Sequence, residues 1–463
     1  MEPTTRTTVL LLGLAFVTAT WEAAYGSDAS SRKSVPPYQN DSDIVGKIAA
    51  LGSRSALTLP PFKVDAKSNI YGCQSVGPVT RGYTMRMVYA PERQTALYHG
   101  GDHQTLRSND VWEYHLGSNT WHMIFEPDGG NQGPLKGVLM FLARKLRDNP
   151  DYRMTTQEQK EYEEVRAWWM ANVVLKDGYL VTSHGGPILP GHTWDTLVYE
   201  PQTRLLIHGT GAYCSDAAVL HGRYHNLPLA DVEKQIDPSY TSIWMFDPAQ
   251  RRWKIHKRPQ QGAMPELRGM GATMCYIPDL GKVIYYVAAQ NVSPHSYQMW
   301  SWDVPKNQWT ELRPNGGKGI SELVLRDHVA PAEEQQTAYS PTHKQMVAVI
   351  GSETFAYDVV KNEWARLNRA VPIEAHDAKT TFAYDSRNDV FLLTDGNKDG
   401  KVAVFSLAEN KWELVTPSGG GCPPSDWGGG PYWGQPKGYY DATHNVLVIH
   451  GGFTNRVWLY RHK

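Results

Sequence analysis

The chain has 463 residues, of which 41% are hydrophobic, 11% aromatic and 20% charged. Its formal net charge is −1, so no overall field favours nucleic acid or an anionic membrane surface as a partner. Single hydrophobic cores stop growing near roughly 250–300 residues, so a chain of this length needs repeated structural units or several domains.

Residues 1–26 have the pattern of a secretory signal peptide. Arg6 precedes an apolar run over residues 9–17, and Ala24 and Gly26 place small residues at the positions that determine cleavage. The apolar run is too short to span a bilayer. We therefore expect a secreted or periplasmic protein, in which residues 27–49 form a polar, flexible leader.

A sequence phrase then recurs along the rest of the chain. A tyrosine and a polar turn lead into a short apolar run, and an Asn-x-Trp closes the unit. The repeat tyrosines are Tyr89, Tyr199, Tyr276, Tyr339, Tyr384 and Tyr440. The closing tryptophans are Trp121, Trp253, Trp309, Trp364 and Trp412, of which the last four lie 56, 55 and 48 residues apart. Self-similarity at this period indicates a propeller, a solenoid or an array.

Each unit contains short apolar runs bounded by glycine and turn residues, which are typical of β-strands. Four short antiparallel strands per unit predict a propeller blade. We count six blades, and the 132 residues between Trp121 and Trp253 leave room for a seventh. The last unit stops after its third strand. Because an unpaired sheet edge invites aggregation, we expect residues 55–59 to supply the missing strand against residues 457–460.

The glycine pairs of His99-Gly100-Gly101 and His450-Gly451-Gly452, with a tryptophan downstream, resemble the kelch repeat, a blade type also seen in galactose oxidase. The resemblance covers roughly residues 70–463. It implies one all-β propeller domain over residues 50–463, with six or seven blades. A fold of this kind implies little about function.

Two long insertions interrupt the repeats, at residues 122–190 and 210–241. The first, between blades 1 and 2, carries helical patterns over residues 135–146 and 156–173, the second of which begins with capping residues. The loops concerned emerge on one face of a propeller, so both insertions are expected there. Long ordered insertions on one face usually shape a binding site, although decoration without a ligand is the alternative.

A candidate site follows from counting eight residues back from each repeat tyrosine, to the expected mouth of the innermost strand. Polar side chains gather at or beside these positions and in the overlying loops: Arg81, His192, Arg268, His328, His376, Tyr432, His103, Arg223, Tyr224 and Trp433. They predict an axial funnel of the kind in which small ligands bind.

Arginine recognises carboxylate and sulfate groups, whereas histidine and tyrosine can move protons. This combination suits β-elimination of a uronate-containing polysaccharide, and the chain is similar in architecture and residue type to secreted polysaccharide lyases such as the ulvan lyases. No lyase motif aligns residue by residue, so the roles are assigned from residue type and from convergence on the funnel. The candidates for proton transfer are His192, His376, Tyr432 and Tyr224. The candidates for substrate binding are Arg81, Arg268, Arg223, His103, His328 and Trp433.

Two other functions stay open. His192, His328 and His376 come from separate strands and are candidates for a divalent metal site, the one cofactor that the sequence suggests. Alternatively, the propeller is a non-catalytic platform that binds glycans or proteins. We expect the protein to be a monomer. Its expected partner is an anionic polysaccharide or another glycan, and we expect neither nucleic-acid binding nor a membrane span.

The four cysteines are Cys73, Cys214, Cys275 and Cys422. Cys73 opens the first blade and Cys422 lies in the loop that leads into the last, and these blades are neighbours in a closed ring. We expect a Cys73–Cys422 disulfide that holds the ring closed. Cys214 and Cys275 are equally compatible with a buried thiol and a loop thiol.

Overall fold

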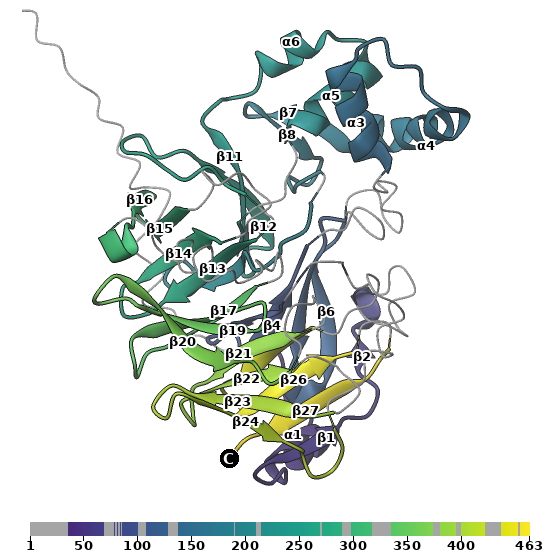
Figure 1. The fold of residues 1–463 in the computed structure, drawn as a ribbon. Helices are drawn as coiled ribbons and strands as arrows, with labels where there is room; N and C mark the ends of the chain where they lie inside the picture. The colour runs from purple at the N-terminus through teal and green to yellow at the C-terminus, as the bar shows by residue number, and fades with distance from the viewer. Residues whose placement is uncertain are drawn as a thin grey trace, which may run out of the picture. The chain divides into compact units, whose positions relative to one another are not determined.

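The structure is a computed structural model. It describes residues 36–68, 78, 81, 84, 86–100, 108–127, 138–188, 190–209, 214–268, 271–288, 298–316, 335–373, 380–394, 400–421, 437–451 and 454–463. Within these ranges, six antiparallel sheets follow one another along the chain, and each is a propeller blade (Figure 1). The prediction of an all-β propeller is confirmed, and the count is six.

Each blade begins with its innermost strand and proceeds outward. Blade 1 contains β3 (Val88–Ala90), β4 (Thr95–Tyr98), β5 (Val111–His115) and β6 (Thr120–Phe125), with β2 (Lys63–Val64) parallel to β6. Blade 2 contains β9 (Leu197–Glu200), β10 (Leu205–His208), β11 (Tyr240–Asp247) and β12 (Arg252–Lys257). Blade 3 contains β13 (Ala272–Ile277), β14 (Lys282–Val287), β15 (Gln298–Asp303) and β16 (Gln308–Glu311).

The second half of the ring repeats this order. Blade 4 contains β17 (Gln336–Ser340), β18 (Gln345–Ile350), β19 (Glu353–Asp358) and β20 (Glu363–Ala370). Blade 5 contains β21 (Thr381–Asp385), β22 (Val390–Thr394), β23 (Val402–Ser406) and β24 (Lys411–Val415). Blade 6 contains β25 (Lys437–Asp441), β26 (Val446–His450), β27 (Val457–Arg461) and, outermost, β1 (Ser55–Thr58).

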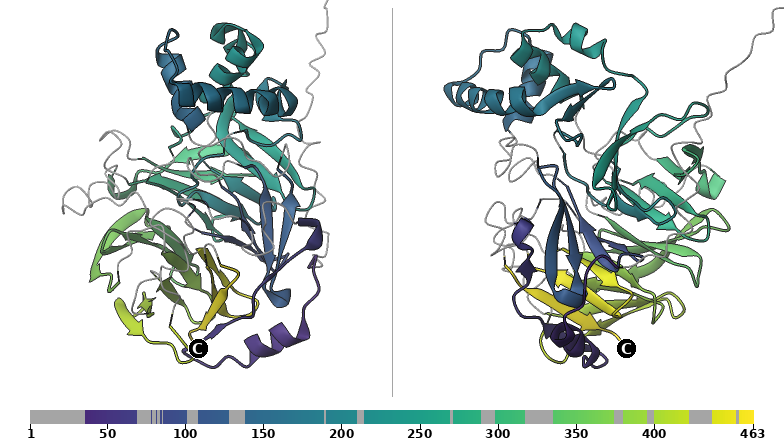
Figure 2. Two further views of the ribbon diagram at one scale, coloured as in Figure 1. Left: turned by 90° about the vertical axis from the view of Figure 1, so that its right-hand side faces the viewer. Right: turned by 180° about the vertical axis from the view of Figure 1, so that it is seen from behind.

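The ring is closed in two ways. The innermost strands contact one another in sequence from β3 to β25, and β25 in turn contacts β3. At the outer edge of blade 6, β1 pairs antiparallel with β27, and Ala56 lies opposite Tyr460 (Figure 2). The predicted pairing of the N-terminal segment with the unfinished last unit is therefore confirmed.

Hydrophobic cores lie between successive blades. The second strand of each blade is buried on both faces, so its alternate residues point into different cores. In β10, for example, Leu206 packs towards blade 1, whereas Ile207 packs towards blade 3. This explains why the second strands appear in the sequence as continuous apolar runs.

The Asn-x-Trp phrase has two structural causes. Its asparagine adopts the left-handed backbone conformation in the turn before the outermost strand, with φ of 51° at Asn119 and 57° at Asn362. Asparagine tolerates this region better than most residues. The tryptophan is buried in a core between blades, as at Trp121 and Trp364.

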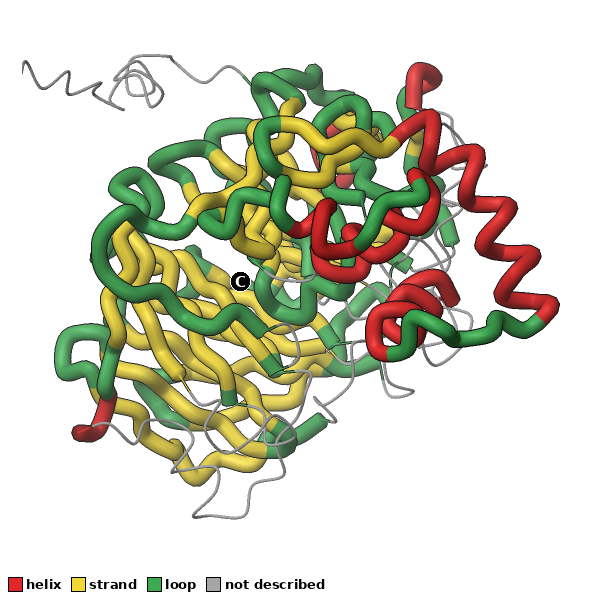
Figure 3. The backbone as a smooth tube through the Cα atoms, turned by 90° about the horizontal axis from the view of Figure 1, so that it is seen from above, coloured by secondary structure: helices red, strands yellow, loops and turns green. Residues whose placement is uncertain are grey.

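The helices carry a separate core. α3 (Val138–Asp148) and α4 (Thr156–Asn172) lie between β6 and β9 in the chain, followed by the hairpin of β7 (Val173–Lys176) and β8 (Tyr179–Thr182). α5 (Cys214–His225) and α6 (Leu229–Glu233) lie between β10 and β11. α3, α4 and α5 contact one another and bury Leu146, Trp169 and Leu220 (Figure 3). Thr155 and Glu158 form a reciprocal capping box at the start of α4.

The predicted flexible leader, residues 27–49, needs a correction at its end. Residues Ser42–Ala49 form the helix α1, which Asp41 caps. Ile44 and Ile48 are buried in the core between blades 6 and 1, together with Leu116. These two apolar residues, four positions apart, form the face by which the helix packs on the propeller. The polar composition of the segment as a whole led to the prediction of a flexible leader.

Short 3-10 turns occur at Ala66–Ser68, Leu116–Ser118 and Pro314–Gly316.

The repeat tyrosines connect the blades to one another. Each lies in an innermost strand, and its hydroxyl reaches the turn of the preceding blade. Tyr339 donates to Asp279 Oδ2 at 2.7 Å, Tyr89 shares a hydrogen bond of 2.5 Å with Thr443, and Tyr199 donates to Glu92. Tyr276 accepts from Gln202, Tyr384 lies 3.5 Å from Thr342, and Tyr440 contacts the backbone N–H of Arg387.

Each of these six partners lies three residues after the repeat tyrosine of the blade to which the partner belongs. The phrase in the sequence is thus a hydrogen-bonded ring, in which every blade holds the next at the end of the innermost strands. We call this set of contacts the tyrosine ring.

We expect β1 to be required for the stability of blade 6. Ala56→Asp places a carboxylate in the core between blades 5 and 6, where Ala56 is buried beside Leu447. An uncompensated buried charge should lower the free energy of unfolding by about 3 kcal/mol or more. Thr58→Asp, on an exposed position of the same strand, should have little effect. Equal losses in a denaturant titration would show that β1 contributes no specific packing.

The tyrosine ring predicts a measurable coupling between blades 3 and 4. Tyr339→Phe and Asp279→Ala should each lower the free energy of unfolding, because each removes one partner of the same hydrogen bond. The double variant should lose less than the sum, with a coupling of about 1 kcal/mol. Additive losses in chemical denaturation would show that this hydrogen bond does not stabilise the ring.

Candidate functional site

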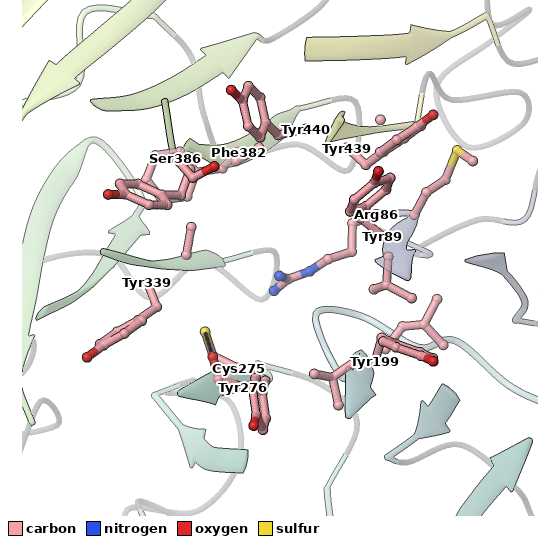
Figure 4. A pocket seen from close by; sticks show the side chains of 18 of the residues that line it. Arg86, Tyr89, Tyr199, Cys275, Tyr276, Tyr339, Phe382, Ser386, Tyr439 and Tyr440 are labelled. Atoms are coloured by element: carbon pink, nitrogen blue, oxygen red, sulfur yellow. Dashed lines mark hydrogen bonds between the residues drawn. The ribbon is translucent and has the colours of Figure 1, made fainter. Parts of the chain in front are cut away.

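A cavity of about 360 Å³ lies on the axis of the ring, where the innermost strands of all six blades meet (Figure 4). Its wall includes the six repeat tyrosines together with Val88, Val198, Cys275, Ala338, Phe382 and Tyr439. The tyrosine hydroxyls are engaged in the tyrosine ring. The cavity wall is therefore formed by apolar side chains and the carbon atoms of aromatic rings.

The cavity does not coincide with the funnel predicted from the sequence. The repeat tyrosines lie at the ends of the innermost strands, close to the turn that leads to the second strand. The predicted positions lie eight residues earlier, and eight residues of extended chain span about 26 Å. The cavity therefore lies at the other end of the innermost strands from the predicted funnel, which stays a prediction.

Arg86 projects its guanidinium group into the cavity (Figure 4). Among the described lining residues, it alone carries a charge. Its Nε donates to Asp195 Oδ1 at 2.6 Å, and its Nη2 contacts the same oxygen. Apart from this contact with Asp195, Nη2 is buried and has no hydrogen-bond partner among the described residues.

Asp195 precedes the innermost strand of blade 2 and is 1% exposed. Burial raises the pKa of this carboxyl group to about 6, although Arg86 opposes the shift. Burial also disfavours the charged form of Arg86, yet the neighbouring carboxylate raises the pKa of Arg86 overall. The pair thus places a cation inside an apolar cavity and supplies a counterion whose charge changes near neutral pH.

Cys275 lies in the same wall as a buried free thiol. Burial raises the pKa of this thiol to about 12, so it remains protonated at neutral pH. Because the thiolate is the nucleophilic form, Cys275 is not a candidate nucleophile. One of the two expectations for Cys275, a buried thiol, is confirmed.

Arg81, which is predicted to bind substrate, does not line the axial cavity. Its side chain is fully buried, and its Nη2 donates to Asp110 Oδ1 at 2.5 Å. The partner is 29 residues away in the chain, so the sequence alone gave no indication of the pairing.

The helices hold two further predicted residues. Tyr224, a predicted proton-transfer residue, is 2% exposed, stacks on Tyr162 and donates its hydroxyl to the carbonyl of Tyr162. Burial raises its pKa above the usual range. Arg223 donates to the carbonyl of Pro150 and so connects α5 to the segment that follows α3. Tyr224 thus belongs to the helical core, whereas the Arg223 side chain is exposed, and neither residue lines the axial cavity.

Two more predicted residues lie elsewhere on the propeller. His192 is partly buried, with its ring edge-to-face on Trp194 at 5.5 Å. Arg268 donates to Glu266 at 3.1 Å, and its backbone N–H donates to the Tyr285 hydroxyl. Neither side chain lines the axial cavity.

The remaining predictions concern residues outside the described ranges. These are His103, His328, His376, Tyr432, Trp433 and both partners of the predicted disulfide, Cys73 and Cys422. Within the described ranges, no group of three histidine, cysteine or acidic side chains is placed to hold a metal ion. The predicted metal site of His192, His328 and His376 and the disulfide therefore stay predictions.

Sequence reasoning missed Arg86 and Asp195, although a signal for the first was present. Arg86 lies three residues before its repeat tyrosine, and the equivalent positions in every other blade are also polar: Thr196, Thr273, Gln336, Thr381 and Lys437. A count of three rather than eight residues would have found a polar layer close to the cavity.

No family model matches the chain, and no curated protein does so either. Solved structures show weak similarity. An auxiliary nutrient-binding protein from Bacteroides ovatus aligns with a TM-score of 0.41 and 10% identity over 88% of this chain and 76% of its own. A protein of unknown function from Bacteroides thetaiotaomicron aligns with a TM-score of 0.28 and 11% identity over 47% of this chain and 53% of its own. Similarity at this level carries no argument about function.

None of the helices in the described ranges is both long and apolar enough to cross a membrane.

The Arg86–Asp195 pair predicts a pH dependence of stability. The pKa of Asp195 is about 6 in the folded protein and about 3.9 in an unfolded chain. The folded state therefore binds this proton more tightly, so its contribution is fully present below about pH 4 and is lost as the pH rises through 6. The loss amounts to about 3 kcal/mol.

This pH dependence is measured by determining the free energy of unfolding at several values between about pH 4 and 7, the range over which Asp195 titrates. Asp195→Asn should remove the component, whereas Asp231→Asn, on the exposed surface of α6, should keep the wild-type slope. Parallel curves for the wild type and Asp195→Asn would contradict the assignment.

Proposed function

We propose that this chain is a ligand-binding propeller whose axial cavity receives a small organic anion, with acidic sugars as the favoured class. The observation that carries the proposal is the Arg86 guanidinium group inside the cavity. Arginine binds carboxylates through parallel N–H donors, and such hydrogen bonds are stronger where water is excluded. The anionic glycan expected from the sequence has a group that fits this recognition.

The size and rigidity of the cavity support the same proposal. Its volume of about 360 Å³ is at the lower end of the range of roughly 300–1,000 Å³ typical of small-molecule sites, which favours one or two sugar units over a long polymer segment. The tyrosine ring fixes the aromatic wall before a ligand arrives. A preorganised wall lowers the entropic cost of binding.

We propose binding in preference to the lyase reaction predicted from the sequence. β-Elimination needs a proton acceptor and a proton donor beside the group that neutralises the carboxylate. Of the predicted proton-transfer residues that the structure describes, Tyr224 lies in the helical core and His192 packs on Trp194. We further propose that this binding takes place outside the cytoplasm, in a kelch-type propeller, as the N-terminal pattern and the repeats predict.

The proposal is tested by calorimetric titration with glucuronate and galacturonate, and with glucose and galactose as neutral controls. The wild type should bind the acids in preference to the neutral sugars. Arg86→Met should weaken binding of the acids about 10-fold or more, because it removes a charged hydrogen-bonding partner. Equal binding of acidic and neutral sugars, or unchanged affinity in Arg86→Met, would contradict the site.

A second variant separates the cavity from the stability of the Arg86–Asp195 pair. Ala383→Phe fills part of the cavity and leaves both charged residues in place. It should abolish binding of the acids while the melting temperature stays near that of the wild type. Appearance of the ultraviolet absorbance of an unsaturated uronate during incubation with polyuronates would instead show that the protein is a lyase.

A further inference from the structure

A second charged cluster lies where blade 6 meets blade 1. It consists of Arg81, Lys437 and His450, with Asp110 and the ring of Tyr98, and we call it the seam cluster. Arg81, Asp110 and Tyr98 belong to blade 1, whereas Lys437 begins β25 and His450 ends β26 in blade 6. None of these residues lines the axial cavity, so the cluster is independent of the function proposed above.

The cluster is buried. Arg81 is 0% exposed, His450 1% and Lys437 3%. Charged groups this deeply buried are rare unless they are paired, because transfer of a single ion out of water costs several kcal/mol. Each charge in the cluster therefore needs a partner.

The described residues do not supply enough negative charge. Arg81 and Lys437 both lie against Tyr98, with Cζ of the first 5.5 Å and Nζ of the second 4.4 Å from the ring centroid. Asp110 is the carboxylate that pairs with Arg81. Its other oxygen accepts from Trp112 Nε1 at 2.6 Å, so both oxygens already have donors. Asp110 thus pairs with Arg81, and Lys437 forms no ion pair with a described residue.

Several donors of the cluster also lack partners. Arg81 Nε and Nη1 have no hydrogen-bond partner among the described residues, and neither ring nitrogen of His450 has one. An unsatisfied buried donor costs about 1–3 kcal/mol. Burial and the charge of Arg81 lower the pKa of Lys437 to about 7. A neighbouring anion would favour its charged form.

We propose that the seam cluster binds a small inorganic anion of the size of chloride. One such anion balances the second cation and accepts from the free edge of Arg81. A monoatomic anion fits better than sulfate or phosphate, because the tetrahedral ions carry four oxygens that each need a donor in a region with at most 3% exposure. The anion connects the first blade to the last, at the junction where the ring closes.

A ligand that binds only the folded state raises its stability as the ligand concentration increases. The melting temperature of the full-length protein is therefore measured in chloride–gluconate mixtures of constant ionic strength. Above the dissociation constant it should rise by about 1–2 °C for each tenfold increase in chloride. Lys437→Met should abolish this dependence, whereas Lys411→Met, on an exposed strand position, should keep it. A wild-type melting temperature that does not respond to chloride would overturn the proposal.

A crystallographic measurement decides the question if Lys437→Met does not fold. Crystals of the wild type grown in bromide should show an anomalous peak within hydrogen-bonding distance of the Arg81 guanidinium group and Lys437 Nζ. Bromide substitutes for chloride and is located without ambiguity by its anomalous signal. Saturating bromide with no peak between these side chains would overturn the proposal.

Discussion

The tyrosine ring is the interaction on which the rest of this propeller depends. Six sheets can pack face to face at many angles, and hydrophobic cores alone do not select one of them. The hydroxyl of each repeat tyrosine contacts the residue three positions after the preceding repeat tyrosine, as a donor in Tyr339 and Tyr199 and as an acceptor in Tyr276, and so links every sheet to its neighbour. Because the same rule applies six times, the angles between blades add up to a closed circle.

The ring also determines what kind of cavity lies on the axis. The hydroxyls of the repeat tyrosines are hydrogen-bonded to neighbouring blades and, in Tyr384 and Tyr440, also to Asp389 and Asn445 of their own blades. Their aromatic rings line the cavity. The residues three positions before the repeat tyrosines are polar, and two of them, Arg86 and Lys437, have ionisable side chains. Of these two, Arg86 lines the cavity. The repeat tyrosines thus connect the blades, whereas Arg86, three positions before Tyr89, projects into the cavity.

The fold could be predicted from the sequence because its determinants are local and repeated. The Asn-x-Trp turn and the apolar second strand each reflect a backbone or burial requirement that recurs in every blade, and the missing strand of blade 6 followed from the count. The site was harder to predict because its residues act through partners in other blades. The sequence does not indicate that Arg81 pairs with Asp110, or that Arg86 pairs with Asp195 of the next blade. Such pairings are set by the ring geometry and leave no trace in spacing.

The pairing of β1 with β27 imposes an order on synthesis. The strand at residues 55–58 is made some 400 residues before its partner at residues 458–461. At translation rates of about 5–20 residues per second, it waits roughly 20–80 s for that partner. During this interval its backbone groups are unpaired and the ring is open between blades 5 and 1. A nascent chain of this protein is therefore most exposed to misassembly in the last moments of its synthesis, when five blades have formed and the sixth has not.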